Sequence, residues 1–276
     1  MRGDPVYLGL PPGTARQEIA FYEKVGFRFG QKGTHTSRTI MLDELFILLR
    51  TAGSMAQRND YRSLIVGDNC LGKRTVATRK LSDQRLSELY SLDPATPLFR
   101  TMRQLWQVDE AGRPLLSLLL AIARDPLLRM TAPSIFQLHP GEELSRQVLL
   151  NDLHQGVGDR FNPTVLEKIV RNIASSWTQS GHLNGRNRKV RCVVKPSPAV
   201  VTYALLLGYA LGARGAVLFQ TLWTKILDVG KEELISLATD AKRFGFLDIK
   251  ASGGIVEVSI DRLLTEEERR LIHGAN

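Results

Sequence analysis

The sequence predicts a mainly α-helical protein in which helix-turn-helix and winged-helix modules surround a central helical bundle and carry small β-hairpin wings. Apolar residues recur at helical spacing over most of the chain. The two clearest strand signals are short hairpins, and each directly follows a predicted helix. With 276 residues, of which 43% are hydrophobic and 24% charged, the chain has enough apolar side chains to bury a sizeable core.

The first half is predicted to hold an arm and a helical domain. Residues 1–36, rich in Gly, Pro and Arg, are expected to form a flexible or loosely docked arm, and residues 37–140 a domain with a helix-turn-helix-like unit. Ser37 is expected to cap the first helix, and Gly72 to break the chain between the second and third. The helices after the first are expected at residues 60–69, 75–92, 98–108 and 115–124.

The second half is predicted to hold two units in which a hairpin follows a helix, over residues 141–196 and 197–276. In the first unit Pro163 lies near the start of a long helix that ends near Gly181, and Asn184 with the following glycine is a strong hairpin signal. The second unit has the order helix, turn, helix, hairpin, which is a winged-helix topology. Its helices are expected at 216–227 and 231–244, and its strands at 246–250 and 255–260.

Several features favour a cytoplasmic protein. No signal peptide is expected, and the apolar run 200–211 is shorter than the roughly 20 residues that a helix needs to cross a membrane. This run is therefore expected to belong to two packed core helices joined by a tight turn. Cys70 and Cys192 lie far apart in the sequence, so reduced thiols are expected.

Positive charge is concentrated in one stretch of the chain. The formal net charge is +9, which favours an anionic partner. Between Lys168 and Lys225 there are nine basic residues and no Asp or Glu, and five of the nine fall within the predicted wing at 186–195. Lys and Arg in such a stretch would neutralise nucleic-acid phosphates. The alternative is a solvated basic loop without a partner.

The end of the helix beside this wing is rich in polar residues. Arg, Asn and Gln can contact base edges, and Ser and Thr suit phosphates. Alternatively, Trp177 anchors the helix and the polar residues only cap it. The candidate DNA-binding residues of the helix and wing are Lys168, Arg171, Asn172, Ser176, Thr178, Gln179, Arg186, Arg188, Lys189, Arg191 and Lys195.

A second candidate site opens the predicted helix at 75–92, where the helix dipole also favours phosphate. It consists of Lys73, Arg74, Arg79 and Lys80. The Gly72-Lys73 pair is similar to the end of a P-loop, but the upstream glycine and the preceding buried strand are missing, so nucleotide hydrolysis is not predicted.

No catalytic, metal or cofactor site is predicted. The five histidines are scattered without ligand spacing, and no nucleophile elbow or dinucleotide-binding glycine motif occurs. Asp125, in an Arg-Asp-Pro sequence, is interpreted as part of a turn that ends an apolar helix. The expected function is therefore non-enzymatic.

The segments DNCLGKRTVATR (68–79), LYSLDP (89–94) and SWTQSGHL (176–183) resemble segments of the BrxA-type proteins. These are small helical proteins of BREX bacteriophage-exclusion loci, once labelled putative inner-membrane proteins. The resemblance covers about residues 38–195 and rests on short motifs, and the arm and the C-terminal unit extend beyond it. It implies a helix-turn-helix-type protein without enzymatic activity that associates with DNA beside a methyltransferase, an ATPase and a phosphatase-like partner.

The leading hypothesis is a DNA-binding accessory component of a phage-defence system. Double-stranded DNA would contact the helix and wing at 163–195, with the cluster at 73–80 as a second contact. One rival is an assembly scaffold whose winged helices bind other defence proteins, and the C-terminal unit suits either role. A second rival, a nuclease subunit, would need clustered carboxylates for a metal ion, which the basic stretch lacks.

Overall fold

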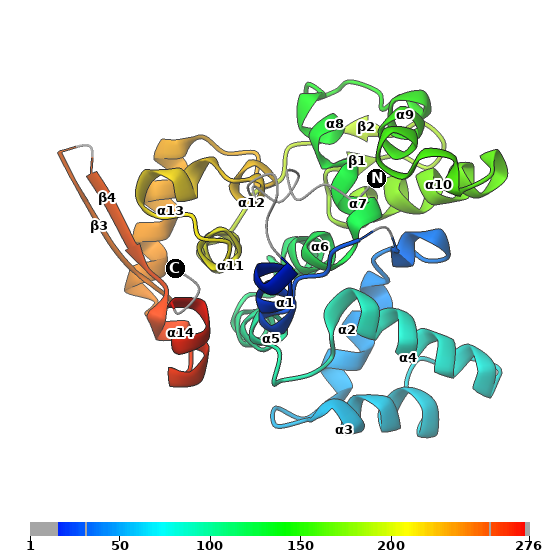
Figure 1. Cartoon of the computed structure of the whole chain (residues 1–276), viewed down its shortest axis with the longest axis horizontal. Helices are drawn as coiled ribbons and strands as arrows, with labels where there is room; N and C mark the ends of the chain where they lie inside the picture. The colour runs from blue at the N-terminus through cyan, green and yellow to red at the C-terminus, as the bar shows by residue number, and fades with distance from the viewer. Residues whose placement is uncertain (1–15, 31, 254, 274–276) are drawn as a thin grey trace.

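The computed structural model describes residues 16–30, 32–253 and 255–273. The protein is mainly helical, as predicted, and the described part contains two two-stranded antiparallel sheets (Figure 1). The elements in chain order are α1 (Arg16–Val25), η2 (Thr34–Thr36), α2 (Leu42–Thr51), α3 (Arg58–Arg62), η3 (Ser63–Gly67), α4 (Val76–Tyr90), α5 (Pro97–Val108), α6 (Arg113–Arg124), α7 (Pro126–Met130), α8 (Ala132–Gln137), α9 (Arg146–Val157), η4 (Gly158–Arg160), α10 (Pro163–Gln179), β1 (Leu183–Asn184), β2 (Val190–Arg191), α11 (Pro198–Ala210), η5 (Gly215–Gln220), α12 (Leu222–Lys225), α13 (Lys231–Arg243), β3 (Asp248–Ser252), β4 (Ile255–Ser259), η6 (Asp261–Leu263) and α14 (Glu266–His273).

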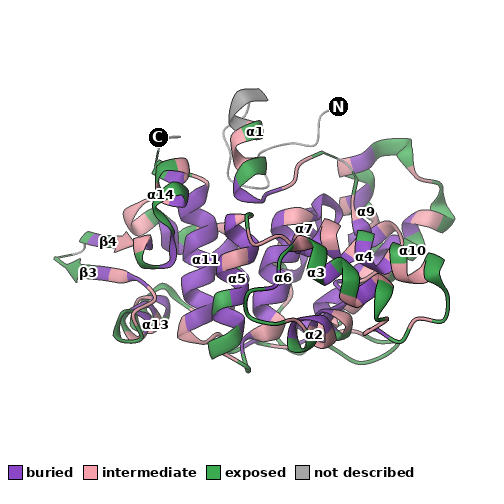
Figure 2. Cartoon of the chain, turned by 90° about the horizontal axis from the view of Figure 1, so that it is seen from below, coloured by how far each residue is buried: buried purple, intermediate pink, exposed green. Residues whose placement is uncertain are grey.

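The centre of the molecule consists of α5, α6 and α11, which lie side by side and are largely buried (Figure 2). Every residue of α6 from Leu115 to Ala123 is buried, and so is every residue of α11 from Ala199 to Ala210. This explains why both segments are almost wholly apolar. The buried apolar side chains form one cluster that extends from Val25 to Ile272, so the helical and hairpin units share one core. Among the described residues, no helix combines the length and apolar character needed to span a bilayer.

The N-terminal unit consists of α2, α3 with η3, and α4. The predicted third helix is confirmed: Thr75 caps α4 by accepting a hydrogen bond from the Thr78 backbone N–H at 3.1 Å. The glycine turn before it is also present, with Gly72 at φ 63°. The first helix begins at Leu42 rather than after Ser37, because Met41 adopts a left-handed conformation with φ 53°.

A buried polar network holds the segment before α2 in place. The ring of His35 lies between two side chains, with Nδ1 2.8 Å from an Asp125 carboxylate oxygen and Nε2 2.8 Å from the Ser176 hydroxyl. Asp125 also accepts the backbone N–H groups of His35 and of Leu127, and none of the three side chains is more than 1% exposed. The network therefore joins η2, the start of α7 and the middle of α10.

The part of the expected flexible or loosely docked arm that the structure describes, residues 16–30 and 32–36, packs against the rest of the molecule from Val25 onward. This stretch contains α1 and η2, and Val25, Phe27 and His35 are fully or almost fully buried. The high content of Gly and Arg in this stretch favoured an arm, but some of these residues make specific contacts. Gly33 packs so closely on Asp125 that a β-carbon there would collide with the carboxylate, and Arg28 donates to the Glu88 carbonyl. Residues 1–15 of the expected arm lie outside the described residues.

The C-terminal unit differs from expectation in two elements. Its hairpin is confirmed, with β3 and β4 paired antiparallel from Asp248↔Ser259 to Ser252↔Ile255. The helix expected at 216–227 is instead the 3₁₀ helix η5 followed by the one-turn helix α12. The last helix, α14, was not predicted. Its sequence is mostly charged, and its burial depends on Ile272 and Glu268.

The His35 network generates a stability prediction. Replacing His35 by Ala would leave the Asp125 carboxylate buried without its side-chain partner, and the unfolding free energy should fall by about 3 kcal/mol. The measurement is urea denaturation followed by circular dichroism. His139→Ala is the matched control, because His139 is exposed, and its unfolding free energy should change by less than about 0.5 kcal/mol. Equal effects of the two substitutions would contradict the role given to the network.

Candidate nucleic-acid interface

The middle unit places a helix beside a small sheet. Its order is α8, an extended segment at 141–144, α9, α10, and the hairpin β1–β2. The hairpin predicted at Asn184-Gly185 is confirmed, although its loop spans 185–189 rather than two residues. On its other side β2 pairs with the extended segment, where the Leu144 N–H donates to Lys189 O at 2.7 Å and the Arg191 N–H to Glu142 O at 2.8 Å. Backbone hydrogen bonds therefore hold both sides of β2.

The start and inner face of α10 follow from its sequence. Asn162 caps the helix by accepting the Val165 N–H at 2.9 Å, and Pro163 fills the first turn, where its missing N–H costs nothing. Ile169, Ile173 and Trp177 recur at helical spacing and are fully buried. Trp177 therefore anchors the helix, as the alternative interpretation of this segment proposed.

The outer face of α10 is polar. Thr164, Lys168 and Arg171 are exposed, and Ser175 and Thr178 continue the same helical stripe as half-buried residues. Lys168 has no acidic partner among the described residues, and Arg171 lies 3.9 Å from an exposed Glu167 oxygen. Such an exposed pair is weak and can be exchanged for a phosphate contact.

Three of the predicted DNA-contacting side chains on α10 form hydrogen bonds to the segment before α2. Asn172 donates to His35 O at 2.8 Å, Ser176 accepts the Ile40 N–H at 2.9 Å, and Gln179 accepts the Leu42 N–H at 3.1 Å. These side chains satisfy the backbone of the segment before α2. Ser176 is fully buried and cannot reach DNA in this fold, so its assignment is corrected, whereas Asn172 and Gln179 are half-buried and their assignment stays a prediction.

The loop of the β1–β2 hairpin at 185–189, named the wing loop after the predicted wing, exposes part of the predicted basic cluster. Arg186 is exposed without an acidic partner in the described part of the chain. Arg188 is 80% exposed and pairs with Glu143 at 2.7 Å, while Lys189 is half-buried and donates to Gly185 O at 2.6 Å. Lys195, beyond β2, is exposed.

Arg191 does not belong to the exposed surface. Its side chain is 4% exposed and forms an ion pair with Asp228, in the turn before α13. It also donates to Ile135 O in α8 at 3.1 Å, and the second Asp228 carboxylate oxygen accepts the Val194 N–H at 3.1 Å. Arg191 therefore joins the base of the wing to the C-terminal unit. Counting basic residues along the sequence does not reveal this role, because the partner Asp228 lies outside the acid-free stretch.

The second predicted cluster lies at the start of α4. Arg74 and Lys80 are exposed and unpaired among the described residues. Lys73 pairs with Glu44 at 3.0 Å, and Arg79 is half-buried and points toward the carbonyls of Lys73 and Val66. Figures 1 and 2 place α4 and α10 at the same end of the molecule, opposite the β3–β4 hairpin.

Sequence reasoning missed Arg146, an exposed cation of the middle unit. It occupies the first turn of α9, directly after the extended segment that pairs with β2. It precedes the acid-free stretch, so charge counting gave no signal for it. Its place beside the wing follows from the pairing of 141–144 with β2, which the sequence did not indicate.

Ser176, His35 and Asp125 have the composition of a hydrolase triad, but they are buried and no substrate can reach them in this conformation. The exposure of all three side chains is at most 1%, and the Ser176 hydroxyl is already occupied by donating to Asn172 O at 2.9 Å and accepting the Ile40 N–H. Burial tends to raise the pKa of Asp125, yet the His35 ring and the hydrogen bonds from His35 and Leu128 outweigh it and lower that pKa. In this conformation the network is a structural tie.

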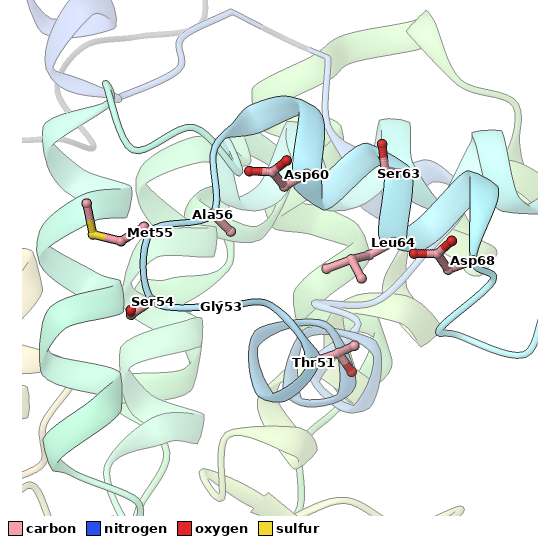
Figure 3. Close-up of a pocket in the computed structure, with 9 residues that line it drawn as sticks. All are labelled: Thr51, Gly53, Ser54, Met55, Ala56, Asp60, Ser63, Leu64 and Asp68. Carbon is pink, nitrogen blue, oxygen red and sulfur yellow. The ribbon is translucent and has the colours of Figure 1, made fainter.

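A surface hollow of about 560 Å³ lies beside the loop after α2 (Figure 3). Asp60 and Asp68 are its charged lining residues, so it does not suit an anion. Within the described residues, no three His, Cys, Asp or Glu side chains form a group that could hold a metal ion.

Comparisons with known proteins add no assignment. No family model matches the sequence, and a search of curated proteins finds no match.

The burial of Arg191 predicts that it contributes to stability and Arg186 does not. Arg191→Ala should lower the unfolding free energy by about 3 kcal/mol, because Asp228 loses its charge partner in a largely buried site. Arg186→Ala should change it by less than about 0.5 kcal/mol. Guanidinium denaturation of both variants distinguishes these values, and a destabilised Arg186 variant beside a stable Arg191 variant would contradict the assignment.

The same junction predicts a pH dependence. His182 lies between Ser180 and the Ile226 carbonyl, and burial lowers its pKa from 6.5 to about 4, although the Ile226 hydrogen bond and Asp228 act in the opposite direction. The unfolded chain therefore binds this proton at a higher pH than the folded protein does. The stability present above pH 6.5 should fall by about 3 kcal/mol as the pH is lowered to 4.

The check is the unfolding free energy of the protein and of a His182→Gln variant, measured at intervals from pH 7 to pH 4. Gln does not titrate in this range, so the variant should show a shallower loss of stability. Parallel pH profiles for the two proteins would rule out His182 as the source of the dependence.

Proposed function

We propose that the protein binds double-stranded DNA through the exposed stripe of α10 and the wing loop at 185–189, and that it performs no catalysis. The observation that carries this proposal is the position of Lys168 and Arg171 on the free face of a helix followed directly by a hairpin with an exposed arginine. In a winged helix, the corresponding helix enters the major groove and the hairpin contacts the adjacent backbone.

The order of elements supports a winged-helix interpretation of the middle unit. Helix α8, the segment at 141–144, helices α9 and α10, and the strands β1 and β2 follow one another as in that fold, with the first extended segment paired to the last strand. Phosphates would be contacted by Arg186, and by Arg188 after exchange of its exposed Glu143 partner. Lys195 and Arg146 are exposed candidates for the flanking backbone.

A second contact on the same DNA is proposed at the start of α4. Arg74 and Lys80 are exposed and form no ion pair with a described residue, and the backbone N–H groups of the first turn add partial positive charge. Because α4 and α10 lie at the same end of the molecule, one duplex would approach both from that side.

The resemblance to BrxA-type proteins suggests the biological setting. We infer an accessory component of a cytoplasmic, BREX-like phage-defence system that works beside a methyltransferase, an ATPase and a phosphatase-like subunit. DNA binding by this chain would bring those proteins to their substrate.

An assembly scaffold is the alternative that a specific observation favours. In a winged-helix interpretation of the C-terminal unit, α13 would be the recognition helix, but exposed Glu232 and Glu233 lie in its first turn, where they would repel phosphate. The same unit exposes Val217 and Ile255, at 60% and 71%. In this alternative the winged helices bind protein partners.

The test compares two variants that lose the same charge. Lys168→Ala combined with Arg171→Ala removes the proposed contact, and Lys231→Ala combined with Arg270→Ala removes two exposed cations of the C-terminal unit. Fluorescence anisotropy with a labelled duplex of mixed sequence should show weaker binding by the first variant alone. Its plot of log affinity against log salt concentration should also lose roughly 2 units of slope, because two phosphate contacts disappear.

Arg191 is left intact in this design, since its loss would disturb the fold as well as the charge. An equal loss in both variants would attribute binding to total charge rather than to α10. No salt-dependent binding by the unaltered protein would reject the DNA proposal and leave the scaffold alternative.

A further inference from the structure

An aromatic side chain is exposed at the end of α13. Phe244 is 66% exposed, and its ring stacks on that of Phe246 with 5.8 Å between centroids and 30° between planes. An exposed phenylalanine ring offers a flat apolar face on which another ring can stack. Phe246, which is half-buried and contacts the core, supports the ring from behind.

The local backbone fixes this arrangement. The Phe246 N–H donates to Ala241 O at 3.0 Å and the Gly245 N–H donates to Lys242 O at 3.0 Å, which is the Schellman pattern of a helix end. The Schellman pattern requires a left-handed backbone conformation at Gly245, which has a φ of 79°. The two phenylalanines flank this glycine, and the turn sets the orientation of both rings.

Four cations belong to this end of the C-terminal unit. Lys242 and Arg243 precede Phe244, and Lys250 and Arg262 lie near Asp248, two residues beyond Phe246. The hydrogen bond from Arg262, with the added charges of Lys242 and Lys250, lowers the pKa of Asp248. The carboxylates in this surface are Asp240, paired with Arg243, Asp248, paired with Arg262, and Glu257, opposite Lys250 in the hairpin. Lys242 donates to the Ile249 carbonyl at 3.2 Å and has no carboxylate ion-pair partner among the described residues, so this surface keeps one positive charge in excess.

We propose that Phe244 is a stacking platform for an unpaired nucleobase, with Lys242 and Arg243 on the adjoining phosphates. The bases of an intact duplex already cover one another, so only a base in a single-stranded segment or at a frayed end can cover this ring. Stacking on an aromatic side chain beside cations is the chemistry with which proteins hold single strands. This inference rests on the proposed function, because it assumes that the ligand is a nucleic acid. The surface it uses is separate from α10.

The experiment uses the full chain and two labelled DNAs, a 15-nucleotide oligothymidine and a blunt 15-base-pair duplex. Phe244→Ala should weaken binding of the single strand roughly tenfold, and Phe244→Trp should retain or strengthen it. Neither substitution should alter binding of the duplex. Ile255→Ala, which removes another exposed apolar side chain of the same hairpin unit, is the matched control and should bind both DNAs normally.

Phe244→Trp also gives a direct optical readout. The three native tryptophans are buried, so an added indole at position 244 would be the most accessible one in the described part of the chain. Oligothymidine should quench its fluorescence, and the duplex should not.

The outcomes separate this proposal from the function proposed for α10. Unchanged single-strand affinity of the Phe244→Ala variant would overturn the platform, as expected if a protein partner covers the ring instead. The platform would also be overturned if Ile255→Ala lost as much affinity. Failure of the α10 proposal is visible elsewhere, in the duplex affinity of the Lys168 and Arg171 variant.

Discussion

The structure depends on the burial of one polar network, in which His35 lies between Asp125 and Ser176. A carboxylate, an imidazole and a hydroxyl are stable away from water only when each finds a partner, and here every partner comes from a different segment. Forming the network therefore places residues 34–42 against both the centre of the molecule and α10. It also determines which side of α10 is used internally: Asn172, Ser176 and Gln179 satisfy the backbone of this segment, so the opposite stripe is left for solvent or a ligand.

A second buried contact divides the basic residues of the wing. Arg191 forms an ion pair with Asp228 and ties the hairpin to the C-terminal unit, which positions the base of the wing. Arg186 and Arg188, on the loop, are held away from that junction and remain exposed. Net charge thus overstates the number of cations that a ligand could contact, because cations such as Arg191 are already paired inside the fold. The free cations of α4, α10 and the wing are the ones available to an anionic ligand.

Sequence patterns predicted the long elements well, because helical periodicity and caps are local. The glycine turn before α4, the start of α10 at Pro163 and the hairpin β3–β4 were all predicted correctly. The errors concern long-range partners. The pairing of His35 with residues 90 and 141 positions away leaves no local signal, and neither does that of Arg191 with Asp228. The sequence therefore indicates neither the packing of the segment around His35 nor the burial of Arg191. The exposed stripe of α10 could not be identified from the sequence. Polar residues occur on two faces of this helix, and only the structure shows which face is exposed and which is bonded inside the protein.

The most direct test of the account is chemical protection of individual lysines by DNA. The unaltered protein is treated with an acetylating reagent with and without a saturating duplex, and modification is measured at each lysine by mass spectrometry. The account predicts that the duplex protects Lys168, Lys80 and Lys195, while exposed Lys231 at the start of α13 reacts equally in both samples. Protection of Lys231 without protection of Lys168 would contradict it.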